Sequence, residues 1–168
     1  SDVYKRQIRN DGFTNVIPIE EIKTIDGISI YRTTGHHGFG QIGQMMGPVS
    51  GYVLKAEGFP TVYIMGDCRW EACIRDTVER FNPDYIVVNS GGAIFPEFSK
   101  TDGPIIPDEN EVMQILDELP SHIKLIAVHM DAIDHCQTTR AILRNEATHH
   151  EADMSRLIIP EDGETVVL

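Results

Sequence analysis

The chain lacks any apolar run long enough for a membrane span, and it is short of positive charge. A membrane-crossing helix needs about 20 consecutive apolar residues, and no stretch of the 168 residues approaches that length. There are 14 lysines and arginines against 26 aspartates and glutamates, which gives a formal net charge of −12. Because a surface of this sign repels a phosphate backbone, we expect no membrane and no nucleic acid among the partners. A small-molecule substrate fits better.

Cysteine is also scarce. The three cysteines, Cys68, Cys73 and Cys136, are odd in number and show no C-x-x-C spacing. This usage is typical of reduced thiols rather than a disulfide framework. We therefore expect a cytoplasmic protein, and a chain of this length suits one packed domain or part of one.

The first residues differ in kind from the rest. Residues 2–7 (DVYKRQ) resemble the translation of a sequencing-library adapter. We expect residues 1–7 to be a scar of this origin and residues 8–168 to form an incomplete domain that lacks its N-terminal part. An ordinary basic N-terminal tail is the alternative.

The pattern of elements changes along the chain. Asp26-Gly27 and Glu57-Gly58 each separate two strand-like runs, which predicts two hairpins over residues 19–32 and 51–65. Helices and strands then alternate, at 70–81, 85–89, 108–119 and 123–128, and Asp108 with Glu111 would form an N-terminal capping pair for the helix at 108–119. A last helix to about 147, which Asp134 would cap, and short strands at 156–159 and 165–168 follow. This order predicts an α/β fold in which ligands bind at the carboxyl ends of the strands.

Three potential metal ligands each follow an apolar run. His37 comes just past the first predicted hairpin, Asp67 follows residues 62–65, and His129 follows residues 123–128. A carboxylate after a buried strand is costly unless something charged pairs with it. A helix N-cap is the competing interpretation for Asp67. Two imidazoles and one carboxylate form half of a two-metal hydrolytic site, and we expect them to converge.

A glycine-rich segment, residues 38–43 (GFGQIG), matches the dinucleotide-binding fingerprint. That fingerprint requires a helix directly after it. Gly47, Pro48 and Gly51 interrupt the stretch that follows, so we expect a close-approach loop instead. A nucleotide-binding α/β module remains an alternative.

Several ordered motifs together resemble the later part of the metallo-β-lactamase-fold hydrolases, in the branch that includes ascorbate-phosphate lactonases. The resemblance spans nearly all of residues 12–168 and rests on the segments 32–38, 46–51, 66–67, 89–92 and 128–136. It implies the C-terminal portion of an αββα sandwich, with two mixed sheets and outer helices. It also implies a metal site that begins with an H-x-H-x-D-H motif. That motif is absent here, since the first histidine of the chain is His36.

The resemblance also implies roles for single residues. His37 matches the third metal-binding histidine, Asp67 the aspartate that bridges two ions and orients the nucleophile, and His129 the last histidine. The metals would be one or two zinc or manganese ions. Candidates for substrate or supporting contacts are His36, Ser90, Gly91, Asp131 and His135.

These expectations define a metal-dependent hydrolase that uses a metal-bound hydroxide on a small ester, lactone or phosphate. The chain alone is expected to be inactive or nearly so, and a homo-oligomer is a possible state. A non-catalytic interaction domain with the same fold is the remaining alternative.

Overall fold

The computed structural model describes residues 2–98 and 102–168 of the chain. The strands are β1 (Ile22–Ile25), β2 (Ile28–His36), β3 (Pro48–Lys55), β4 (Val62–Ile64), β5 (Tyr85–Asn89), β6 (Lys124–Val128) and β7 (Leu157–Ile158). The helices are α1 (Asp2–Asn10), α2 (Gly40–Met46), α3 (Ala72–Phe81), α4 (Glu109–Glu118) and α5 (Arg140–His149). The predicted α/β class is confirmed.

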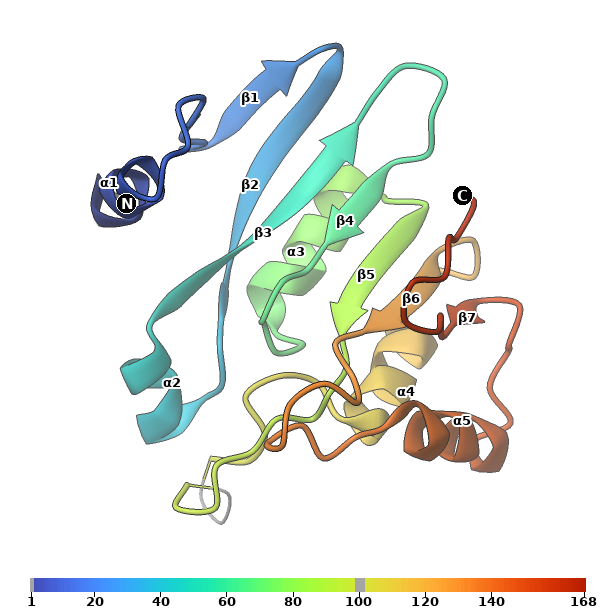
Figure 1. The fold of residues 1–168 in the computed structure, drawn as a ribbon. Helices are drawn as coiled ribbons and strands as arrows, with labels where there is room; N and C mark the ends of the chain where they lie inside the picture. The colour runs from blue at the N-terminus through green and yellow to red at the C-terminus, as the bar shows by residue number, and fades with distance from the viewer. Residues whose placement is uncertain (1, 99–101) are drawn as a thin grey trace.

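The seven strands form a single mixed sheet in sequence order, β1 to β7 (Figure 1). Strands β1 to β4 pair antiparallel, whereas β4 to β7 pair parallel. The second sheet expected for the sandwich is therefore not formed by the described residues. The face that such a sheet would cover bears apolar side chains in register, since Ile64 pairs with Val87 and Val87 with Ile126.

Local sequence explains two of the three antiparallel pairs, β1–β2 and β3–β4. Asp26 and Gly27 adopt φ values of 49° and 83°, the left-handed pair that a two-residue hairpin turn requires. β3 and β4 pair with the Glu57-Gly58 turn between them, as the sequence predicted.

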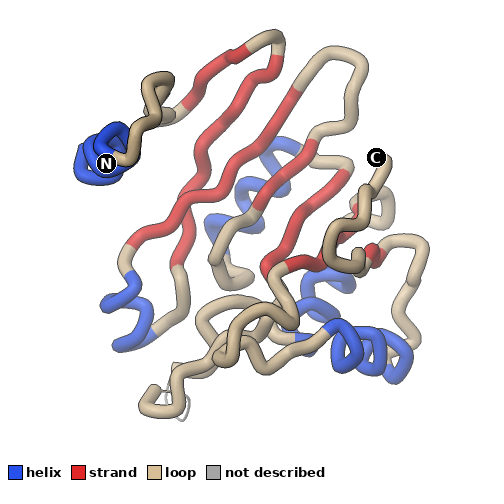
Figure 2. Tube along the Cα trace, in the orientation of Figure 1, coloured by secondary structure: helices blue, strands red, loops and turns tan. Residues whose placement is uncertain are grey.

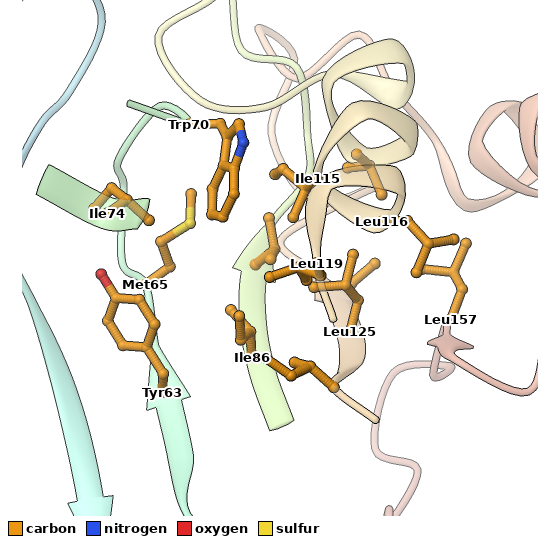
Figure 3. Packing of buried hydrophobic residues seen from close by; sticks show 14 of the residues in the cluster. Tyr63, Met65, Trp70, Ile74, Ile86, Ile115, Leu116, Leu119, Leu125 and Leu157 are labelled. Atoms are coloured by element: carbon orange, nitrogen blue, oxygen red, sulfur yellow. The ribbon is translucent and has the colours of Figure 1, made fainter. Parts of the chain in front are cut away.

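Helices α3, α4 and α5 cover one face of the sheet. Their buried residues Ile74, Ile115 and Leu143 belong to the same apolar cluster as the strand residues Tyr63 and Leu125. Alternation along a strand points those strand side chains to one face. Figure 3 shows Ile115 and Leu119 facing Ile86 and Leu125 across this layer. The predicted alternation of strands and helices is thereby confirmed for this half of the chain.

Three local expectations need correction. Asp108 caps α4 by accepting a hydrogen bond from the Glu111 amide at 2.9 Å, but the Glu111 carboxylate is engaged elsewhere. Thr139 rather than Asp134 caps α5, because its hydroxyl reaches the Ile142 amide at 3.1 Å. Residues 165–168 form no strand, and β7 is the last strand in the described part of the chain.

The region set aside as an adapter scar is helical. Helix α1 includes residues 2–10 and lies beyond the edge strand β1, apart from the helices that cover the sheet (Figure 1). Within residues 2–98 and 102–168, no helix combines the length and apolar character needed to cross a bilayer.

Candidate metal centre

Four strands end at one edge of the sheet. β2 and β4 both run antiparallel to β3, and β5 and β6 run parallel to β4, so all four point the same way. Figure 2 shows the loops gathered at this edge. His37 follows β2, Asp67 follows β4 and His129 follows β6. The topology therefore delivers the three predicted ligands to one place.

The Asp67 carboxylate lies between the two histidines. His37 Nε2 is 4.0 Å from Asp67 Oδ2, and His129 Nε2 is 4.0 Å from Asp67 Oδ1. This separation is too long for a hydrogen bond. It is within the span of two metal–ligand bonds of about 2.0–2.2 Å each. Imidazole nitrogen and carboxylate oxygen suit zinc and manganese, so the residues present fit the implied metal.

Neighbouring polar groups orient these side chains. His37 Nδ1 is 3.1 Å from the Ile105 carbonyl oxygen, which can only accept a hydrogen bond. Nδ1 therefore carries the proton, and the Nε2 lone pair is free on the side of Asp67. Asn89 Nδ2 donates to Asp67 Oδ1 at 2.6 Å. Asn89 was not among the predicted site residues, although an amide at the end of an apolar strand was the available signal.

Backbone strain concentrates in the turn after β6. His129 and Asp131 adopt φ values of 66° and 63°, in the left-handed region that non-glycine residues rarely occupy. Gly91 packs against this turn, and a Cβ there would lie 2.4 Å from the His129 carbonyl oxygen and 2.7 Å from Cys136 Sγ. Only glycine fits such an approach. Gly91, predicted to contact substrate or support the site, thus lies directly against the His129 backbone.

Other predicted supporting residues have different partners. Ser90 is buried, and its hydroxyl donates to the Val88 carbonyl at 3.0 Å. Asp131 accepts from Arg140 Nη1 at 2.7 Å, and the His135 ring stacks on Phe95 with centroids 5.2 Å apart. These contacts tie Ser90 and Asp131 into the scaffold, because their polar atoms are already hydrogen-bonded.

His36 does not face Asp67. Its Nδ1 lies 2.9 Å from each oxygen of Glu71, and its backbone amide donates to Glu71 Oε1 at 2.8 Å. Consecutive residues at the end of a strand point to opposite sides. His36 and His37 are therefore directed to two different carboxylates.

The glycine-rich segment differs in part from the expectation. A helix, α2, does begin within it, but this helix has seven residues and leads into an antiparallel pair rather than a β-α-β unit. The Asp102 carboxylate accepts from the Ile42 amide at 2.9 Å, and a Cβ on Gly40 would lie 2.5 Å from Asp102 Oδ1. A protein carboxylate occupies the place where the fingerprint would hold a phosphate. The close-approach loop explains this segment better than a nucleotide cradle does.

A buried ion pair beside the site was not foreseen. Arg69 Nε lies 2.5 Å from Glu111 Oε2, and Glu111 Oε1 accepts from the Trp70 amide at 2.7 Å. Burial raises the pKa of Glu111, although the Arg69 charge opposes this shift. Arg69 also donates to the Pro104 carbonyl, one residue before the carbonyl that orients His37. No local motif signals this pair, because Arg69 and Glu111 are 42 residues apart.

Comparisons with known proteins agree with this architecture. The chain is 31% identical over 162 residues to the UPF0173 protein YddR of Bacillus subtilis, covering 95% of this chain and 61% of that protein. A possible metal-dependent hydrolase from Veillonella parvula, known from its crystal structure, is 31% identical in sequence and superposes with a TM-score of 0.90. The match covers 99% of this chain and 64% of the other chain. The crystal structure of an isothiocyanate hydrolase from Delia radicum gut bacteria has 32% sequence identity and a TM-score of 0.87. That match covers 99% of this chain and 66% of the other chain. No protein-family model matches.

A structure with lower sequence identity identifies the fold. The metallo-β-lactamase fold protein YhfI of Bacillus subtilis superposes with a TM-score of 0.57 at 13% identity, over 93% of this chain and 58% of that one. The described chain has the metallo-β-lactamase fold over the part that it spans. It covers less than two thirds of the length of each of these proteins.

Proposed function

We propose that this chain contributes His37, Asp67 and His129 to the divalent-metal site of a hydrolase. The observation that carries the proposal is the Asp67 carboxylate, with a histidine Nε2 at 4.0 Å from each of its oxygens. Support comes from two similar structures, which are described as a possible metal-dependent hydrolase and an isothiocyanate hydrolase. A divalent ion would supply Lewis acidity and lower the pKa of a bound water.

The chain's own residues would prepare this chemistry. The Ile105 carbonyl accepts the Nδ1 hydrogen bond of His37, which leaves the Nε2 lone pair available to bind a metal ion. Asn89 holds Asp67 Oδ1, which fixes the carboxylate rotamer so that Asp67 orients a water and accepts its proton. The proposed substrates are small esters, lactones or phosphates, each with an electrophilic centre that water attacks. The isothiocyanate carbon named for one similar structure is an electrophile of the same kind.

We also propose that the 168-residue chain alone turns over slowly. His37, Asp67 and His129 would together offer two imidazoles and one carboxylate, which is too few ligands for two catalytic ions. Catalytic zinc sites take about three protein ligands. Ile64, which is 36% exposed on the sheet face opposite the helices, would also favour self-association. A cytoplasmic location and a small-molecule substrate stay predictions.

Metal titration tests the site without requiring activity. We expect the purified chain to bind Mn²⁺, measured by electron paramagnetic resonance of the free ion, and Asp67→Asn to weaken binding at least about tenfold. Glu71→Gln is the matched control, because Glu71 contacts His36 rather than Asp67. Binding that survives Asp67→Asn, or that Glu71→Gln abolishes, would refute the proposed ligands.

Hydrolysis is then measured with a nitrophenyl ester, a lactone, a phosphodiester and an isothiocyanate, with Mn²⁺ or Zn²⁺ added. We expect little metal-dependent turnover by the 168-residue chain. Rapid turnover that a chelator removes would contradict the proposed inactivity while supporting the hydrolase assignment.

A further inference from the structure

A second set of donors lies beside the candidate metal centre. His36, Glu71 and Cys73 each offer a ligand atom, and these atoms lie within 4.8 Å of one another. Among the described residues, this is the one group of three such side chains that is so compact. His37, Asp67 and His129 do not belong to it.

The geometry points to a second divalent-cation site, specific for thiophilic ions such as Zn²⁺, formed by His36, Glu71 and Cys73. Zinc bonds to nitrogen and oxygen at about 2.0–2.2 Å and to sulfur at about 2.3 Å, which places tetrahedral ligands roughly 3.5 Å apart. Donor atoms at the 4.8 Å limit would therefore close by about 1.3 Å, whereas His36 Nδ1 and the Glu71 oxygen, 2.9 Å apart, would separate by about 0.6 Å. A water would complete four-coordination.

Backbone contacts already hold these donors in place. Glu71 is the N-cap residue of α3 and Cys73 lies in its first turn. Glu71 Oε1 accepts from the backbone amide of His36, and the Arg69 amide donates to the His36 carbonyl at 3.1 Å. The end of β2 and the start of α3 are thus joined before any ion binds. Little ordering is required on binding.

Charge and exposure favour a cation. A divalent ion would displace the thiol proton of Cys73, because burial and the Glu71 charge raise the pKa of Cys73 to about 11. Glu71 and the resulting thiolate would then supply two negative charges beside a neutral His36 imidazole. The net charge of −12 also attracts cations. The His36 side chain is 66% exposed whereas that of Glu71 is 17% exposed, so an ion can enter from solvent and still meet a mostly shielded carboxylate.

Sulfur separates this site from the other one. A thiolate selects Zn²⁺ and Co²⁺ over Mg²⁺ and Ca²⁺, whereas His37, Asp67 and His129 offer nitrogen and oxygen alone. Cys136 Sγ lies near that trio, 3.7 Å from His129 Nδ1, on the side of the imidazole ring away from Nε2. A bound ion at the second site would link β2 to the segment that carries Asp67. This role does not depend on the proposed hydrolase activity.

Cobalt titration of the whole chain tests the inference. We expect Co²⁺ to produce the near-ultraviolet sulfur-to-cobalt charge-transfer band, and Zn²⁺ but not Mg²⁺ to displace it. Cys73→Ser should abolish the band, and Glu71→Gln should weaken binding at least about tenfold. Cys136→Ser and Asp67→Asn are the matched controls, and both should keep the band. Circular dichroism without metal checks that each variant folds.

The opposing outcomes are distinct. A wild-type chain without the band overturns the second site, as does a band that persists in Cys73→Ser or disappears in Cys136→Ser. Loss of Mn²⁺ binding in Asp67→Asn bears on the hydrolase proposal alone. If Cys73→Ser does not fold, Glu71→Gln decides the question, and an unchanged cobalt affinity in that variant overturns the site.

Discussion

The parallel half of the molecule, β4–β7 with α3–α5, is packed on one face, whereas the antiparallel half, β1–β3, has little packed against it. Among the described residues, Val53 is the one buried side chain that β1–β3 contribute to the main apolar cluster. In β1, Ile22 is 53% exposed. The antiparallel half rests mainly on ladder pairing among its own strands and between β3 and β4. It serves the candidate site by carrying His36 and His37 to the edge that the parallel half forms.

The largest expected effect tests what anchors the parallel half. Glu111→Ala removes the partner of Arg69, and truncating one member of a buried pair costs about 3–5 kcal/mol of unfolding free energy. Chemical denaturation monitored by tryptophan fluorescence measures it. Glu161→Ala is the control, because its pair with Arg144 is exposed and such pairs contribute about 0–1 kcal/mol. Equal losses in the two variants would show that the Arg69 pair does not anchor this half.

A matched pair of apolar truncations compares the halves directly. Leu125 in β6 is fully buried, and Leu125→Ala should cost about 2–5 kcal/mol through lost contacts and a cavity. Ile22→Ala in β1 should cost less than about 1 kcal/mol, since the side chain is half exposed. Urea unfolding of the two variants and the wild type measures both losses of unfolding free energy. A loss at Ile22 as large as at Leu125 would mean that the antiparallel half is packed in solution.

The smallest effect is a pH dependence at the outer side of the parallel half. Hydrogen bonds from Arg75, Gln114 and Trp70 lower the pKa of Glu118 from 4.5 to about 2. A carboxylate with a lowered native pKa stabilises the fold above its unfolded pKa and loses that contribution as the pH falls from 4.5 towards 2. Glu118→Gln should therefore be less stable than wild type at pH 7, with a smaller difference near pH 2.

Thermal unfolding at several pH values measures this difference. Glu79→Gln, on the exposed surface of α3, controls for the loss of one negative charge. A wild-type chain whose advantage over Glu118→Gln stays constant down to pH 2 would contradict the assigned hydrogen bonds.

Sequence patterns predicted the elements best where residues close together in the sequence specify them. The Asp26-Gly27 turn, the strand at residues 85–89 and the Asp108 cap depend on residues close in sequence, and all three are confirmed. Thr139 was missed as a cap because Asp134 offered an equally good local signal. Which of the two residues caps α5 depends on where the helix must begin for Leu143 to pack in the apolar core.

The sequence by itself determined the α/β order and the three donors that follow apolar strands, because hydrophobic period and turn residues are local properties. Only the tertiary structure decided which side chains each donor faces. It directed His37 and His129 to Asp67, His36 to Glu71 and Cys73, and the Glu111 carboxylate to Arg69. These partners lie 30 to 62 residues apart or on opposite sides of one strand end, so strand direction and burial, rather than spacing, select them.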